Sequence, residues 1–232
     1  MIGCIIQARM GSSRLPGKVL MKSGNGKSLL YYVINQLRHC SKVKNLVIAT
    51  TTNQVDDEIE KFANNNSVNI FRGKEKDVLD RYFQCAKKYS FSTIVRITAD
   101  CPLIDPQIVD SVIEKFFSGS YDYATNTLIR TFPMGTDVEV FSFSALERTW
   151  KNAKLPSERE HVSPYMMKNS DIFRQFHLRN PIKIPPLRLT IDKEEDLELC
   201  RNIISKISKH PILLHDILEL YGNEPKLFEI NS

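Results

Sequence analysis

The sequence predicts an α/β fold of the doubly wound type, in which a mostly parallel sheet carries helices on both faces. Short apolar runs and amphipathic helical segments alternate four times before residue 120. Such alternation is typical of β-α-β units, whose crossover connections make neighbouring strands parallel. A loop with three basic residues and two glycines follows the first apolar run. Folds of this type bind ligands at that position, beyond the carboxyl end of a strand.

The first half of the chain supplies the regular part of this pattern. Five apolar residues share one face of the first predicted helix, and Asp105 is expected to cap the helix that begins with Pro106. Strands are expected at 2–6, 44–52, 68–71 and 92–99, and helices at 28–40, 55–66, 75–89 and 106–117.

The second half is less regular, and no linker separates it as a domain of its own. We expect one domain over residues 1–232, with 1–120 as the ligand-binding half, 121–190 as a smaller inserted β/α lid or dimerisation segment, and 191–232 as C-terminal helices. Strands are expected at 121–126, 137–143, 173–178 and 187–191, and helices at 144–153, 157–169, 193–208 and from Leu213.

Composition and charge exclude several classes of protein. The net charge of +5 is spread along the chain, whereas nucleic-acid binding requires a concentrated basic stripe. The five cysteines are an odd number without CxxC spacing, so neither a disulfide framework nor a zinc site is indicated. No apolar window approaches the roughly 18 residues of a membrane span. We therefore expect a cytoplasmic protein that contacts neither nucleic acid nor membrane.

The loop "QARMGSSRLPGKVL", residues 7–20, is suited to an anion. Glycines allow close approach of the backbone, and Arg14 and Lys18 offer charge-assisted hydrogen bonds to phosphate oxygens. The loop matches neither the P-loop nor the G-x-G-x-x-G pattern. A triphosphate is the predicted guest, and the alternative is a basic surface loop with turn glycines.

Several ordered blocks resemble the sugar-activating cytidylyltransferases. This family includes CMP-ketodeoxyoctulosonate synthetase, acylneuraminate cytidylyltransferase and the spore-coat-polysaccharide F-type proteins. The blocks span roughly residues 1–208 and read "IIQARMGSSRLPGKVL", "RGKEKDVLDRY", "VRITADCPLIDP", "DVEVFSFSALE", "LPSEREHVSPY" and "LTIDKEEDLELCR". The resemblance implies a Rossmann-like nucleotidyltransferase fold, a homodimer, and transfer of CMP from CTP to a sugar acid with release of pyrophosphate.

The resemblance also implies which residues contact the nucleotide. Arg14 and Lys18 would bind the triphosphate and stabilise the pyrophosphate as it leaves, which makes them the expected catalytic residues. For Asp77 and Arg81 the alternative is a surface ion pair, because they lie four positions apart on one helix. The expected nucleotide contacts are Ala8, Arg9, Gly11, Ser12, Arg14, Lys18, Gly73, Asp77, Asp80 and Arg81.

Two aspartates are candidate Mg²⁺ ligands. Asp100 ends the fourth predicted strand, where a carboxylate suits a hard cation; the alternative role is a turn cap. Asp192 with Glu195 forms a capping-box pattern at a helix start, and the second metal aspartate of the resembled family falls at Asp192. Mg²⁺ held between Asp100 and Asp192 is the predicted cofactor.

The blocks in the inserted segment should face the acceptor. Asp137 and Glu139 alternate with valines and are expected to share one face of a strand. Arg159 is the candidate for the acceptor's carboxylate or phosphate. Glu160 and His161 complete the expected acceptor site, although His161 could also be a structural histidine.

We therefore predict a Mg²⁺-dependent cytidylyltransferase for surface-polysaccharide biosynthesis. Its acceptor would be a small acidic sugar or sugar phosphate. One alternative is a glycosyltransferase that uses nucleotide sugars, but the D-x-D motif usual in that class is missing. The other alternative is a non-catalytic nucleotide-binding protein, which would not need two separated metal carboxylates.

Overall fold

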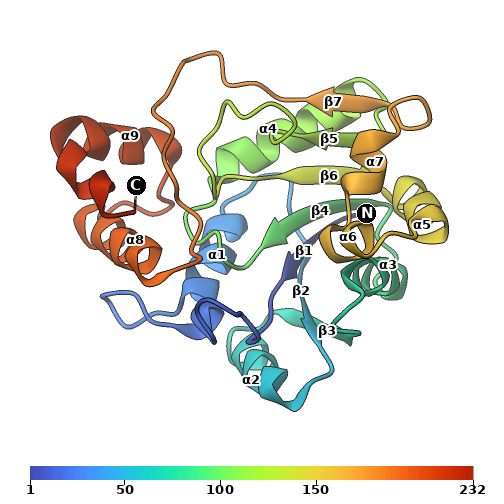
Figure 1. Ribbon diagram of the computed structural model, residues 1–232, viewed down its shortest axis with the longest axis horizontal. Helices are drawn as coiled ribbons and strands as arrows, with labels where there is room; N and C mark the ends of the chain where they lie inside the picture. The colour runs from blue at the N-terminus through green and yellow to red at the C-terminus, as the bar shows by residue number, and fades with distance from the viewer. Residues whose placement is uncertain (232) are drawn as a thin grey trace.

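The computed structural model describes residues 1–231 and contains a seven-stranded sheet in the order β3-β2-β1-β4-β6-β5-β7 (Figure 1). Neighbouring strands pair in parallel except where β6 meets β4 and β5. The predicted doubly wound, mostly parallel sheet is therefore confirmed. The strands are β1 Ile2–Gln7, β2 Leu46–Thr51, β3 Asn69–Gly73, β4 Thr93–Thr98, β5 Tyr123–Thr125, β6 Glu139–Ser142 and β7 Gln175–His177.

Helices cover both faces of the sheet and one of its ends (Figure 1). Asp105 caps α4, as predicted, because its carboxylate accepts from the backbone N–H of Gln107 at 2.7 Å. The α-helices are α1 Leu29–Arg38, α2 Asp57–Asn65, α3 Val78–Lys88, α4 Pro106–Ser118, α5 Phe143–Asn152, α6 Pro156–His161, α7 Pro164–Lys168, α8 Glu194–Lys206 and α9 Leu214–Asn223. Short 3₁₀ helices lie at η1 Lys18–Leu20, η2 Gln54–Asp56 and η3 Pro225–Asn231.

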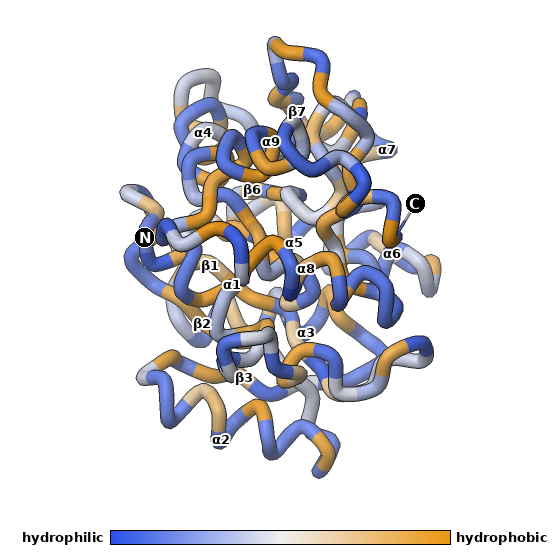
Figure 2. The backbone as a smooth tube through the Cα atoms, turned by 90° about the vertical axis from the view of Figure 1, so that its left-hand side faces the viewer, coloured by the Kyte–Doolittle hydropathy of each residue, from blue (hydrophilic) through white to orange (hydrophobic). Residues whose placement is uncertain are grey.

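Alternate residues of each central strand face opposite layers, which explains the continuous apolar runs. In β1, Cys4 and Ile6 pack with α1, α2 and α4, whereas Ile5 packs with α3 and α5. A strand buried on both faces needs apolar residues at every position. Figure 2 shows hydrophobic segments along β1 and α1 in the middle of the molecule and a mixture of hydrophilic and hydrophobic residues along α2 at its edge.

The segment 121–190 belongs to the same sheet as the first half. It supplies β5, β6 and β7, and β6 pairs with β4. A third apolar cluster joins α8, α9 and η3 to the start of α1. Both later parts thus lie at the sides of one central sheet, with the C-terminal helices at the left of Figure 1.

Two expected elements differ from the structure. Residues 187–191 form no strand of the sheet. Arg188 instead makes one isolated bridge with Met134. The expected helix 157–169 is broken into α6 and α7 at Val162, whose φ is +71°. The backbone N–H of Ser163 donates to the carbonyl of His161 at 2.9 Å, which closes a γ-turn around a β-branched residue.

No helix among residues 1–231 is long and apolar enough to cross a membrane. The five cysteines are all buried and free. Burial raises the pKa of the Cys200 thiol to about 12, so this thiol is protonated at neutral pH and unreactive. No disulfide framework is present among the described cysteines, as the spacing predicts.

Candidate active site

The basic loop lies beyond the carboxyl end of β1, and hydrogen bonds to Asp56 and within the loop hold its backbone. The backbone N–H of Met10 donates to the Asp56 carboxylate at 2.7 Å, and the N–H of Gly17 donates to the Met10 carbonyl at 2.8 Å. Gly17 has a φ of +74° and immediately precedes η1, a left-handed conformation that favours glycine. These contacts hold η1, and with it Lys18, in a fixed place.

The loop forms one wall of a cavity of about 320 Å³. The opposite walls come from the end of β4, from α6 and from the turn before α8. The cavity therefore gathers residues that are up to 185 positions apart, from Gln7 to Asp192. It is lined by Gln7, Arg9, Gly11, Ser12, Ser13, Arg14, Lys18, Val19, Val78, Thr98, Ala99, Asp100, Glu160, His161 and Asp192.

Lys18 lies between the two predicted metal aspartates. Its ammonium Nζ donates to Asp100 Oδ2 at 2.9 Å and to Asp192 Oδ1 at 3.1 Å, and also to the carbonyl of Ile191. The Lys18 side chain is only 11% exposed. Asp100 and Asp192 therefore converge on one point, which their separation of 92 positions in the sequence does not show.

Arg14 extends over the same cluster from the solvent side. Its guanidinium lies 3.0 Å from Asp192 Oδ1, and 64% of its side chain is exposed. Burial alone raises the pKa of Asp192, but the hydrogen bond and charge of Lys18, with Arg188 and Arg14, hold that pKa below its ordinary value. Asp192 is thus ionised at neutral pH and surrounded by three cations.

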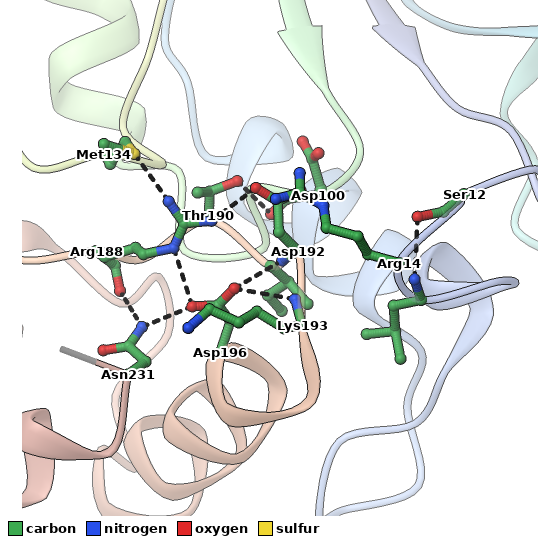
Figure 3. A network of polar contacts seen from close by, with 12 residues as sticks. Ser12, Arg14, Asp100, Met134, Arg188, Thr190, Asp192, Lys193, Asp196 and Asn231 are labelled. Carbon is green, nitrogen blue, oxygen red and sulfur yellow. Dashed lines mark hydrogen bonds and ion pairs between the residues drawn. The ribbon is translucent and has the colours of Figure 1, made fainter.

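The helix cap at α8 differs from the one expected. Asp192 with Glu195 does not form the capping box; instead the Asp196 carboxylate accepts from the backbone N–H of Asp192 at 2.9 Å and of Lys193 at 3.1 Å (Figure 3). The helix begins at Glu194 and its N-cap is Lys193. The carboxylate that accepts from the N-cap N–H is therefore that of Asp196, one residue after the expected Glu195. This leaves the Asp192 side chain free of capping and directed toward the cavity.

The β3–α3 loop contributes less to the cavity than expected. Gly73, Asp77, Asp80 and Arg81 are absent from its described lining, as is Ala8. Asp77 caps α3 by accepting from the Asp80 N–H at 2.9 Å. Arg81 is buried and donates to the carbonyl of Lys74 at 2.8 Å, so the alternative of an Asp77–Arg81 ion pair is wrong. The nucleotide contacts assigned to these residues stay a prediction.

Arg159 faces α3 rather than the cavity. Its guanidinium binds Asp77 in a bidentate pair at 3.0 and 2.5 Å and donates to the Trp150 carbonyl at 2.8 Å. Glu160 and His161, which follow it at the end of α6, do line the cavity. The ion pair thus fixes α6 on α3 and turns the next two residues toward the site.

Asp137 and Glu139 do not share one strand face. Asp137 precedes β6 and makes an exposed ion pair with Arg130 at 2.7 Å. Glu139 is buried, pairs with Arg96 and accepts from the Tyr123 hydroxyl at 2.6 Å. Neither residue belongs to the described lining of the cavity, and their contact with an acceptor stays a prediction.

The donor set at the cavity mouth fits a hard divalent cation. No group of three His, Cys, Asp or Glu residues that could hold a metal occurs among residues 1–231. However, two carboxylates and the Ile191 carbonyl converge on the Lys18 ammonium, and oxygen ligands of this kind suit Mg²⁺, which keeps several waters and needs only one or two carboxylates from the protein.

Two residues that position this site were missed by the sequence analysis. Asp56 holds the basic loop, and Arg188 binds Asp192 at 2.6 Å. Asp56 lies in a run of acidic residues that reads as the first turn of a helix, and Arg188 lies in a stretch that reads as a strand. Neither carries a motif, so only their position in space reveals their part in the site.

The fold and this cavity define an α/β protein of the nucleotidyltransferase class, with cations suited to a triphosphate beside paired carboxylates. The model of the cytidylyltransferase family matches residues 3–225. The chain belongs to that family, as the ordered sequence blocks predict. The expected homodimer stays a prediction. Exposed apolar side chains within 121–190 are Leu128, Ile129, Met134, Leu155, Ile172 and Ile182.

Similar proteins include members of known and unknown role. An uncharacterized protein of Methanocaldococcus jannaschii is 38% identical over 230 residues, covering 98% of this chain and 93% of its own. The spore coat polysaccharide biosynthesis protein SpsF of Bacillus subtilis is 34% identical over 229 residues, covering 95% and 94%. A 3-deoxy-manno-octulosonate cytidylyltransferase of Chlamydia trachomatis is 27% identical over 209 residues, covering 85% and 79%.

Solved structures agree with the fold. A cytidylyltransferase from Leptospira borgpetersenii has a TM-score of 0.95 and 37% identity, and the match covers 100% of this chain and 97% of that one. The structure of CMP:2-keto-3-deoxy-manno-octonic acid synthetase complexed with CTP has a TM-score of 0.68 at 16% identity, covering 88% and 98%. The second likeness supports the fold alone.

Proposed function

We propose that this protein transfers CMP from CTP to an acidic sugar or sugar phosphate and releases pyrophosphate, in the biosynthesis of a surface polysaccharide. The observation that carries the proposal is the convergence of Arg14, Lys18, Asp100 and Asp192 on one cavity. Membership of the cytidylyltransferase family supports the choice of CTP. The similarity to a spore coat polysaccharide biosynthesis protein supports the choice of pathway.

The basic loop would bind the triphosphate. Arg14 is 64% exposed, so its guanidinium can leave Asp192 and donate to phosphate oxygens without loss of buried contacts. Lys18 is held closer to the carboxylates and would meet the phosphates nearest to them. Placed positive charge stabilises the pyrophosphate as the bond from the α-phosphorus to its leaving oxygen breaks.

Asp100 and Asp192 would hold Mg²⁺, because their carboxylates converge and oxygen ligands suit a hard cation. When bound, the ion would neutralise phosphate charge and align the reacting groups. The chain's own contribution is to keep both carboxylates aimed at one point, through the hydrogen bonds of Lys18 and Arg188.

The acceptor would bind against the end of α6. Because Arg159 is engaged by Asp77, His161 is the side chain from 121–190 in the described cavity lining that can carry positive charge. We assign the acceptor's acidic group to His161 and its hydroxyl groups to the Glu160 carboxylate. An acidic acceptor oxygen needs little activation before it attacks the α-phosphorus, so no general base is assigned.

Pyrophosphate release from CTP, Mg²⁺ and a panel of sugar acids and sugar phosphates tests the proposal. We expect release with CTP and a raised melting temperature in the presence of CTP, because a ligand that binds only the native state stabilises it. ATP and GTP should give neither effect. Equal thermal shifts from all three nucleotides would contradict the cytidylyl assignment.

A further inference from the structure

We propose that Arg188 is a positioning residue for the cation site, and that it acts by fixing which oxygen of Asp192 faces Asp100. The inference rests on the proposed function, because it assigns a role within the same site. Arg188 lies outside the described lining of the cavity and therefore acts through Asp192 rather than on a substrate.

The two oxygens of Asp192 have different partners. Arg188 Nη2 donates to Oδ2 at 2.6 Å, and Arg14 lies 3.0 Å from Oδ1 (Figure 3). Lys18 Nζ also donates to Oδ1, at 3.1 Å. With Oδ2 engaged, Oδ1 is the oxygen that remains for a cation shared with Asp100. Arg188 thus sets the rotation of the carboxylate group and makes Asp192 a single-oxygen ligand.

Arg188 is itself held from several sides. Its Nε donates to Asp196 Oδ1 at 3.0 Å, and Asn231 Nδ2 donates both to the Arg188 carbonyl and to Asp196 Oδ1 at 2.9 Å. The Asp196 side chain is 1% exposed. Arg188 therefore bridges the buried Asp196 carboxylate and the Asp192 carboxylate at the cavity. Only a planar, branched guanidinium can do this, because it has separate donors for the two partners.

The loop 133–136 fixes the backbone on the other side of Arg188. The N–H of Met134 donates to the Leu187 carbonyl at 3.1 Å, and the N–H of Leu189 donates to the Met134 carbonyl at 2.7 Å. Gly135 has a φ of +98°, and a Cβ there would lie 2.5 Å from the backbone of Leu189. The close approach explains the glycine and places the guanidinium beside Met134, as Figure 3 shows.

The test is Mn²⁺ affinity, measured by the electron paramagnetic resonance signal of the free ion, in the full chain with Arg188→Gln and Arg188→Lys. Both variants are made in the wild type and in Lys18→Met, since removing the ammonium opens the carboxylates to the ion. Loss of a partner that orients a metal ligand weakens metal binding about 10–100-fold. We expect a loss in this range for Arg188→Gln and a smaller one for Arg188→Lys, which retains the positive charge.

Arg72→Gln is the matched control. Arg72 also bridges two carboxylates, Asp57 and Glu60, and its side chain is 23% exposed against 25% for Arg188. Because the Arg72 guanidinium contacts the β2 end and α2 rather than Lys18, Asp100 or Asp192, we expect unchanged Mn²⁺ affinity even if the melting temperature falls. Pyrophosphate release should need more Mg²⁺ in Arg188→Gln, while CTP still raises the melting temperature.

Three outcomes overturn the inference in distinguishable ways. Mn²⁺ affinity equal in wild type and Arg188→Gln, with normal binding in both, contradicts the positioning role and leaves the proposed function standing. Absence of Mn²⁺ binding in the wild type and in Lys18→Met contradicts the cation site itself, and with it the proposed function. Equal loss in Arg188→Gln and Arg72→Gln would assign the effect to general destabilisation and also contradict the inference.

Discussion

Two clusters of charged side chains lie at the carboxyl-end half of the sheet, and they differ in access. The open cluster, Lys18 with Asp100 and Asp192, lines the cavity, and its carboxylates are 27% and 21% exposed. The closed cluster, Arg96 with Glu139 and their partners Tyr123 and Ser163, lies within the sheet, and the Glu139 side chain is 6% exposed.

The difference in exposure separates a cluster whose side chains can exchange their protein partners for a ligand from a cluster whose side chains cannot. In the closed cluster Glu139 is buried against Arg96, Tyr123 and Ser163. Burial together with the Glu139 carboxylate raises the pKa of Tyr123 well above its ordinary value. Arg96 also donates to the cavity residue Gln7 at 3.3 Å. The closed cluster therefore supports the cavity wall from behind, while the open cluster lines the cavity itself.

Glu139→Gln should have the largest effect, and on stability rather than on catalysis. The change leaves the buried Arg96 guanidinium without its counter-charge, and breaking a buried pair costs about 3–5 kcal/mol. The free energy of unfolding, measured by urea denaturation, should fall by that amount. Asp137→Asn is the control, because its pair with Arg130 is exposed and worth about 0–1 kcal/mol. Equal losses in both variants would remove the distinction between the clusters.

Lys18→Met should have the next largest effect, on turnover. Removing one placed cationic donor from a reaction site costs about 10²–10³ in rate, or 2.7–4 kcal/mol. The fold should persist, because Met fills the space of the lysine stem and the carboxylates retain access to water. Pyrophosphate release and melting temperature are measured together. The control is Lys44→Met, because Lys44 is exposed and precedes β2, at the end of the sheet away from the cavity. Wild-type turnover in Lys18→Met would contradict its role.

The smallest effect concerns the support of the open cluster and depends on pH. Burial alone raises the pKa of Asp196, but hydrogen bonds from the Asp192 and Lys193 N–H groups, Asn231 and Arg188 hold it below its ordinary value. A carboxyl group whose pKa is lower in the folded than in the unfolded state stabilises the fold at pH values above its unfolded-state pKa, which is near 4. That stabilisation is lost as the pH falls through the folded-state pKa.

Asp196→Asn should therefore lower the free energy of unfolding by about 1–3 kcal/mol at neutral pH, the range for a hydrogen bond to a charged group. The gap between variant and wild type should narrow as the pH falls below about 4, because the unfolded-state carboxylate is protonated there while the native one takes up its proton only at a lower pH. Urea denaturation at several pH values measures both curves. A gap that stays constant down to acid unfolding would show that the charge of Asp196 contributes nothing.

Much of the fold followed from local pattern. The run "IGCII" predicts a strand buried on both faces, and Ile5 and Ile6 do lie in opposite layers. Asp105 before Pro106 predicts the start of α4. Patterns of this kind are local, because periodicity and capping depend on residues a few positions apart. The second half was less predictable, since Val162 interrupts a helical pattern with a strained turn that only tertiary packing maintains.

The sequence by itself determined the class of fold, and it predicted an anion-binding loop with Lys18 and Asp100 as site residues, because each follows a strand whose end defines the ligand edge of the sheet. Only the tertiary structure decided which charges meet. It placed Lys18 between Asp100 and Asp192, engaged Arg159 with Asp77, and buried Glu139. Charge pairing depends on distances of about 4 Å between residues far apart in the chain, and no local pattern encodes those distances.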